Sequence, residues 1–180
     1  MHEDTARAPV SGQRALEADP RRFRAALGRF VTGVTIVTTL DASGRPVGLT
    51  ANSFNSVSLD PPMVLWSLAR RSANLPLFEG ASHYAINILA ADQHALSDRF
   101  ARPVEDRFAG VDWTPGVCGM PVLAGVTAVF ECVNDTRVDG GDHVVFLGRV
   151  EAFEEQDRVP LVFHSGRYAR PHYALPADRG

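Results

Sequence analysis

The chain has 180 residues and a mass of 19.5 kDa, a length that predicts one domain with a sizeable buried core. Its net charge of −3 gives no basic excess of the kind that indicates nucleic-acid binding. All 18 basic residues are arginine, so Schiff-base chemistry, a phosphate-loop lysine and a lysine general base are excluded.

The cysteines and histidines predict neither a disulfide framework nor a metal site. Cys118 and Cys132 form no CxxC pair, and the six histidines show no HExxH or other close ligand spacing. Residues 1–18 are polar, without the apolar core of a signal peptide, and no segment has the ~20 apolar residues of a membrane span. We expect a soluble, cytoplasmic protein with reduced thiols.

The first predicted element is a helix that begins at Asp19 and Pro20, residue types that favour an N-cap and a first helical position. Apolar residues then follow at helical spacing, at Phe23, Ala26, Leu27 and Phe30. Next come a β-branched strand over 31–40, a turn over 41–44, its hairpin partner over 47–54, an extended segment over 57–59 and a uniformly apolar, buried strand over 63–68.

The second half contains further strands and two helices. In order, we expect a helix over 72–78 capped by Ser72 with Gly80 past its end, a buried strand over 84–89, an amphipathic helix over 92–101, a loop over 102–119, strands over 126–138 and 144–153 around a turn at 139–142, and a short strand over 161–163. Roughly seven strands without βαβ alternation predict a mostly β fold with flanking helices, an antiparallel barrel. We expect a disordered arm over 1–18, one domain over 19–173 and a flexible tail over 174–180.

Several nucleotide and hydrolase motifs are absent or incomplete. The segment 28–35 resembles a phosphate loop, but Val34 stands where the lysine belongs and the order runs from helix to strand. No G-x-G-x-x-G turn is present, so a Rossmann nicotinamide domain is excluded. No G-x-S-x-G elbow supports a hydrolase triad.

Three segments place polar residues where a plain barrel would not. The strand end 48–54 carries small hydrogen-bonding side chains, which suit the edge of a flat ring or simply a polar barrel end. The segment 67–74 has two arginines before a possible helix N-terminus, which suits a phosphate or a solvated loop. In the turn 140–143, glycines explain the turn but leave Asp142 and His143 unexplained.

Four motifs together resemble the flavin reductase family. They are GLTANSFNSVSLDPPMVLWSL with the following RRSAN, then FAGVDW over 108–113, and GGDHVVFLGRVE. The resemblance runs from about Phe23 to Tyr168. It implies an FMN-binding split barrel and the reductase component of a two-component flavin-dependent monooxygenase.

The resemblance also implies a role for individual residues. Flavin contacts fall on Gly48, Leu49, Thr50, Asn52, Ser53, Ser67, Leu68, Ala69, Ser72, Ala73, Asn74, Arg99 and Phe100, with the phosphate at 72–74. His143 would orient the nicotinamide of NADH or NADPH, and Gly166, Arg167 and Tyr168 would close over the same face. Individual contacts of Arg70 and Arg71 stay open, because this stretch varies in the family.

The implied reaction is hydride transfer from NADH or NADPH to FMN or FAD, without a covalent catalyst. Reduced flavin would then diffuse to a partner monooxygenase or halogenase, and the family implies a homodimer. A non-enzymatic flavin carrier on the same barrel is the alternative. It would need neither His143 nor the segment 166–168. An oxidase of a small phosphorylated amine is a third possibility, which the absence of lysine disfavours.

Overall fold

The computed structural model describes residues 19–172, so the predicted arm over 1–18 and tail over 174–180 lie outside the described residues. Helix α1 (Pro20–Leu27) begins as predicted, because the Asp19 carboxylate accepts the N–H groups of Arg21 (2.9 Å) and Arg22 (3.3 Å). It ends at Leu27, and none of its residues is buried. The apolar stripe therefore does not pack on the core of its own chain.

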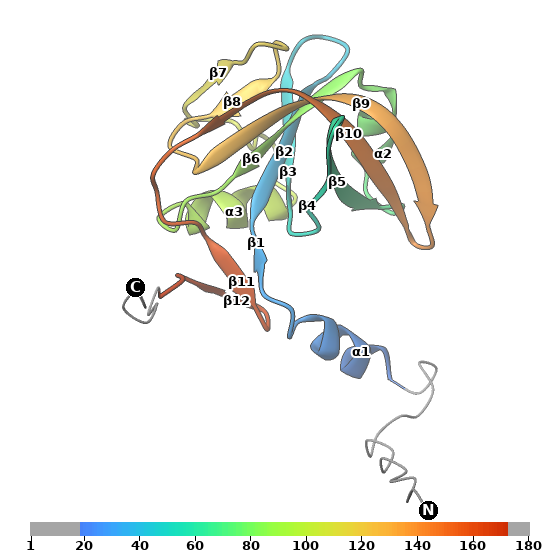
Figure 1. Ribbon diagram of the computed structural model, residues 1–180, viewed down its shortest axis with the longest axis vertical. Helices are drawn as coiled ribbons and strands as arrows, with labels where there is room; N and C mark the ends of the chain where they lie inside the picture. The colour runs from blue at the N-terminus through green and yellow to red at the C-terminus, as the bar shows by residue number, and fades with distance from the viewer. Residues whose placement is uncertain (1–18, 173–180) are drawn as a thin grey trace, which may run out of the picture.

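Seven antiparallel strands form the main sheet, in the spatial order β3-β2-β6-β9-β10-β5-β4 (Figure 1). Their bounds are β2 Thr35–Leu40, β3 Pro46–Ala51, β4 Asn55–Leu59, β5 Pro62–Ala69, β6 His83–Ile88, β9 Ala128–Gly140 and β10 His143–Glu155. The sheet curls, yet its edge strands β3 and β4 share no ladder and are joined only through 52–54. The predicted antiparallel split barrel is therefore confirmed.

Ser53 ties this link to β5, the strand next to the edge strand β4. Its Oγ accepts the backbone N–H of Ser67 (2.9 Å) and donates to the Ser67 carbonyl (3.1 Å). Asn55 pairs with Leu65, so Ser53 lies where the β4–β5 ladder would continue. One hydroxyl thus replaces a pair of backbone hydrogen bonds at the split.

The remaining elements are short and depart most from the predictions. They are α2 (Leu75–Gly80), α3 (His94–Ala101), the hairpin of β7 (Trp113–Pro115) and β8 (Pro121–Leu123), and a small sheet of β1 (Thr32–Gly33), β11 (Val162–His164) and β12 (Arg167–Ala169). The predicted loop 102–119 thus contains a strand. The predicted strand 31–40 is two strands, because its start pairs with β11 and the rest pairs with β3 and β6.

Strands β2 and β6 are covered on both faces, which separates the core into two clusters. Val37 and Ile86 belong to a cluster inside the barrel, whereas their neighbours Ile36 and Ala85 belong to a second cluster with Phe100 of α3. Successive side chains of a strand point to opposite faces, so each strand supplies both clusters. No helix within 19–172 is long and apolar enough to cross a membrane.

Aromatic rings fill the inner cluster. Trp66 stacks on Phe146 (centroids 4.6 Å apart) and meets Phe78 edge-on (5.1 Å). On β5 only alternate residues, among them Trp66 and Leu68, are fully buried, so the predicted uniform burial of that strand is wrong. The other face of β5 is half-buried and continues toward the polar turn after Ala69.

Candidate functional site

The predicted phosphate-binding segment forms an irregular turn between β5 and α2. Helix α2 begins at Leu75 with Asn74 at its N-cap, so the prediction that Ser72 caps it and that Gly80 lies past its end is wrong. The Ser72 hydroxyl instead accepts the backbone N–H of Asn74 (3.3 Å). Any anion here would therefore be held by the turn rather than by a helix N-terminus.

The side chains of the two arginines in this turn differ in their partners. Arg70 is committed to the β9–β10 turn: its Nε donates to the Gly141 carbonyl (3.0 Å), its guanidinium pairs with Asp139, and its N–H donates to the Asp142 carbonyl (2.9 Å). Within 19–172 the guanidinium of Arg71 has no hydrogen-bond or ion-pair partner. Arg71 is therefore the arginine available to a ligand.

Backbone donors accompany the Arg71 side chain. Among the described residues, the N–H groups of Arg71 and Ala73 meet no acceptor, whereas that of Ser72 donates to the Ala69 carbonyl (2.9 Å). A guanidinium beside exposed N–H groups is a donor set that suits phosphate oxygens. The turn 71–74 therefore fits the phosphate of a flavin nucleotide.

His143 begins β10 beside this turn. It pairs with Ala69 on β5 and with Gly140 on β9, and its Nδ1 lies 2.7 Å from Oδ1 of Asp142. The hydrogen bond from His143 holds the pKa of Asp142 below its usual range, so the carboxylate stays ionised and accepts a hydrogen bond from Nδ1–H. In the tautomer that carries its proton on Nδ1, Nε2 is an acceptor, and the His143 side chain is 43% exposed.

A second group of predicted residues gathers at α3. The Thr50 hydroxyl donates to the Ser97 carbonyl (2.6 Å), and the Tyr168 hydroxyl donates to Oδ1 of Asp98 (2.9 Å). Burial raises the pKa of Tyr168, so the phenol stays protonated at neutral pH. Arg99 of the same helix donates to the Asp106 carbonyl (3.1 Å). These polar groups hold β3, α3 and β12 together.

Three predicted flavin contacts have side chains in the core. Leu49 and Leu68 belong to the inner cluster, and Phe100 is 1% exposed in the outer one. A Cβ on Gly48 would lie 2.9 Å from the Phe100 ring, so this glycine allows the helix to pack on β3. The Asn52 side chain, by contrast, is exposed and free to reach a ligand.

Within one chain, the two predicted parts of the nicotinamide site do not lie together. His143 lies at the β9–β10 turn, whereas Gly166 and Arg167 lie at the β11–β12 turn, at a separate place in the molecule (Figure 1). Gly166 lines a cavity of about 390 Å³ against α1, together with Arg21, Arg24 and Arg29. That cavity is rich in guanidinium groups, which suit a pyrophosphate.

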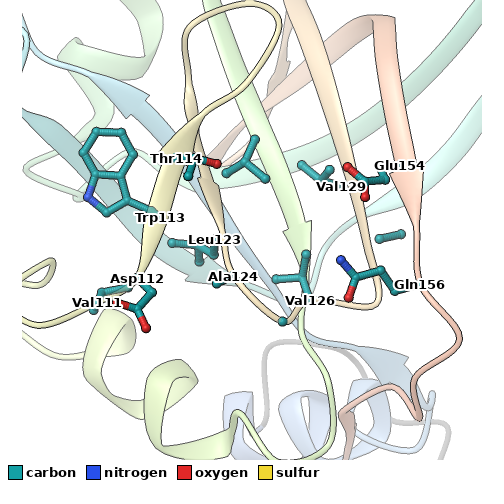
Figure 2. Close-up of a pocket in the computed structure, with 13 residues that line it drawn as sticks. Val111, Asp112, Trp113, Thr114, Leu123, Ala124, Val126, Val129, Glu154 and Gln156 are labelled. Carbon is teal, nitrogen blue, oxygen red and sulfur yellow. The ribbon is translucent and has the colours of Figure 1, made fainter.

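A larger cavity of about 520 Å³ is lined by none of the predicted site residues. It lies between the β7–β8 hairpin and the ends of β9 and β10, and Trp113, Leu123 and Val126 line it (Figure 2). Its charged lining side chains are the carboxylates of Asp112 and Glu154. Because carboxylates repel phosphate, this cavity does not suit a flavin nucleotide.

Comparisons with known proteins decide the family. The model of the flavin reductase like domain matches residues 27–172. The chain belongs to the flavin reductase-like family. Its members include "FMN reductase (NADH) SmoA" from Agrobacterium fabrum, 47% identical over 83% of this chain and 85% of that protein. A reductase subunit of a flavin-dependent monooxygenase, HsaB from Rhodococcus jostii, is 41% identical over 93% of this chain and 89% of its own length.

Solved structures of this family share the fold. Nitrilotriacetate monooxygenase component B from Mycobacterium thermoresistibile superposes with a TM-score of 0.85 at 38% identity, covering 91% of this chain and 94% of that one. The family member from Rhizobium meliloti named a probable flavin reductase is 50% identical, and this chain spans 50% of its length. The predicted family and fold class are thus confirmed.

The sequence did not distinguish Arg70 from Arg71. Arg70 is committed because its side chain and backbone meet the β9–β10 turn, which lies far along the chain. Likewise, nothing local to Tyr168 indicates that Asp98 is its partner. The polar residues over 48–54, the arginines over 67–74 and the adjacent Asp142 and His143 carried local signals, but such signals do not indicate which distant residue each side chain contacts.

Proposed function

We propose that this chain is an NAD(P)H:flavin oxidoreductase that reduces FMN or FAD with NADH or NADPH and releases the reduced flavin to a partner monooxygenase or halogenase. The observation that carries the proposal is the placement beside His143 of a turn with donors unpaired within 19–172, the Arg71 guanidinium and the N–H groups of Arg71 and Ala73. Ala69 directly precedes that turn and pairs with His143 across β5 and β10. The names of the relatives support both the reaction and the partner class.

The residues present fit a flavin nucleotide. Arg71 and the free N–H groups of Arg71 and Ala73 would bind the phosphate, and the exposed amide of Asn52 would meet the ring edge. When bound there, the flavin would supply the acceptor for the hydride of the reduced nicotinamide. Ser53 would act indirectly, by holding the 52–54 link against β5.

His143 would position the nicotinamide rather than exchange protons. With its Nδ1–H donating a hydrogen bond to the Asp142 carboxylate, the histidine's Nε2 would accept a hydrogen bond from the carboxamide of NADH. Positioning of this kind lowers a barrier by holding the donor near its acceptor. No residue needs to form a covalent intermediate.

Replacement of His143 tests this assignment. In steady-state assays under air, His143→Ala is expected to raise KM for NADH about tenfold, the value of one lost hydrogen bond, and to leave KM for FMN nearly unchanged. His172→Gln, an exposed histidine, is the control. An equal rise in both KM values would remove His143 from the nicotinamide site. Flavin binding without any NADH consumption by the unaltered chain would favour the carrier instead.

We further propose a homodimer that completes the nicotinamide site from two chains. Large apolar side chains are exposed just after α1 and at the end of β4, at Phe30 (77%) and Leu59 (94%). Apolar surface of this kind is typical of protein interfaces. The second chain would bring a β11–β12 turn near His143, which one chain does not do. Sedimentation equilibrium should give twice 19.5 kDa, and a monomer mass would contradict the proposal.

A cytoplasmic location belongs to the same proposal. Both cysteines of the described chain are free, and Cys132 is buried. Free thiols are typical of reducing compartments, which also hold the reduced nicotinamide that the reaction needs.

A further inference from the structure

Three side chains that are distant in the sequence meet on the barrel, and none of them is a predicted flavin contact. His83 begins β6, Cys118 lies in the β7–β8 turn, and Glu151 lies on β10. The imidazole nitrogen, the thiol sulfur and the carboxylate oxygen of these residues all lie within 4.8 Å of one another. Each belongs to a residue type that binds transition metals in proteins.

Neighbouring groups aim these three side chains at a common point. The Nδ1 of His83 lies 2.9 Å from the Ser82 hydroxyl, which occupies that nitrogen and leaves Nε2 for the cluster. Metal-binding histidines are usually held in this way through their second nitrogen. Glu151 lies at a β-bulge, between Val150 and Ala152, and bulges re-aim side chains.

The buried carboxylate of Glu131 fixes the position of the turn that carries Cys118. Glu131 is 5% exposed and accepts the backbone N–H groups of Val117 (2.8 Å) and Cys118 (2.7 Å). Gly116 makes room for it, because any Cβ there would collide with the carboxylate. The turn that carries Cys118 is therefore held against β9 by specific contacts.

The separations between these atoms approach those of a tetrahedral zinc site. The Sγ of Cys118 lies 3.5 Å from Oε2 of Glu151, and Nε2 of His83 lies 3.6 Å from the same oxygen. Bond lengths of about 2.3 Å to sulfur and about 2.0 Å to nitrogen and oxygen place tetrahedral ligands roughly 3.3–3.5 Å apart. Small side-chain movements would complete the geometry.

We propose that His83, Cys118 and Glu151 bind one Zn²⁺ ion, with water as its fourth ligand. Coordination through Sγ breaks the S–H bond and releases that proton to solvent. A sulfur, nitrogen and oxygen donor set selects Zn²⁺ over Mg²⁺ or Ca²⁺. The prediction of no metal site rested on close spacing in the sequence, and the fold supplies the cluster from three separate elements instead.

The charges around the cluster favour a cation. Glu131 and Glu151 contribute two carboxylates against one guanidinium, that of Arg149, which lies 3.6 Å from the other oxygen of Glu151. A bound Zn²⁺ would join the β7–β8 turn to β6 and β10. Because the ion binds only the folded chain, it would raise the melting temperature.

Cobalt substitution tests the site without flavin or NADH. The full chain, stripped with a chelator, is titrated with Co²⁺ while the thiolate-to-cobalt charge-transfer band in the near ultraviolet is recorded. We expect one Co²⁺ per chain, displaced by Zn²⁺, and a higher melting temperature with either ion. Cys118→Ser should abolish the band, although it keeps Cys132. His83→Gln should weaken binding more than roughly tenfold, since even outer-shell changes cost 10–100-fold.

The controls separate the site from adventitious binding. His172→Gln should bind Co²⁺ as the unaltered chain does. Without metal, Cys118→Ser should have the same melting temperature as the unaltered chain, because Cys118 lies in a partly exposed turn. If that variant fails to fold, Glu151→Gln serves in its place and should weaken the band in the same way. Absence of a charge-transfer band, or a band that survives Cys118→Ser or both other ligand variants, would overturn the proposal.

Discussion

Gly148→Ala is expected to lower the free energy of unfolding by about 3 kcal/mol, because overpacking a tight core costs up to roughly that much. Gly148 lies on β10 beneath the Tyr84 ring, where an added Cβ would lie 2.9 Å from Cζ of Tyr84 and 3.0 Å from Cβ of Cys132. Neither neighbour can move freely, since both are fully buried. For a chain of this size, the melting temperature should fall by roughly 6–12 °C.

Two further variants separate the steric cause from a general effect of alanine. Gly33→Ala adds a Cβ with no atom within 4 Å and should leave stability nearly unchanged. The double variant Gly148→Ala with Tyr84→Phe removes the colliding hydroxyl, which has no hydrogen-bond partner among the described residues, and should recover part of the loss. Equal melting temperatures for Gly33→Ala and Gly148→Ala would contradict the packing described for β10.

Arg71→Ala is expected to raise the Kd of FMN about tenfold or more, as the loss of a charge-assisted hydrogen bond to phosphate requires. Arg71 has no partner within 19–172, so its removal leaves no protein group unpaired. Fluorescence titration of FMN measures the change. Riboflavin lacks the phosphate, so its Kd should be the same for the variant and the unaltered chain.

Arg158→Ala serves as the matched control for this experiment. Arg158 is also exposed, but it pairs with Asp92 (2.6 Å) rather than with any group at the β5–α2 turn. Its replacement should leave the Kd of FMN unchanged. If Arg71→Ala weakened riboflavin as much as FMN, the turn 71–74 would not be the phosphate site.

Local sequence signals predicted the strands, the hairpins and the helix start at Asp19. Sequential antiparallel pairing depends on neighbours in the chain, so β-branched runs separated by turn residues indicate it directly. The hairpin of β9 and β10 around the glycine turn is one such case. The N-cap at Asp19 is another, because its contacts span only two and three residues.

Features that depend on distant contacts were predicted poorly. Strand β7 was missed because its segment is rich in proline and glycine, and it forms only by pairing with β8. The exposure of α1 could not be predicted either, because the spacing of apolar residues indicates an apolar helix face but not which surface packs against that face. In the site, the roles of Arg70 and Arg71 differ only because Asp139 and Gly141 lie beside the first.

Anaerobic reduction of bound flavin tests the central claim most directly. The full chain is mixed with FMN and one equivalent of NADH without oxygen, and the absorbance of oxidised flavin is followed beside that of NADH. We predict that both fall together with one NADH consumed per flavin, far faster than in a mixture without protein, and that FAD behaves alike. Flavin that binds the chain but keeps its oxidised absorbance in the presence of NADH would contradict the proposed reductase.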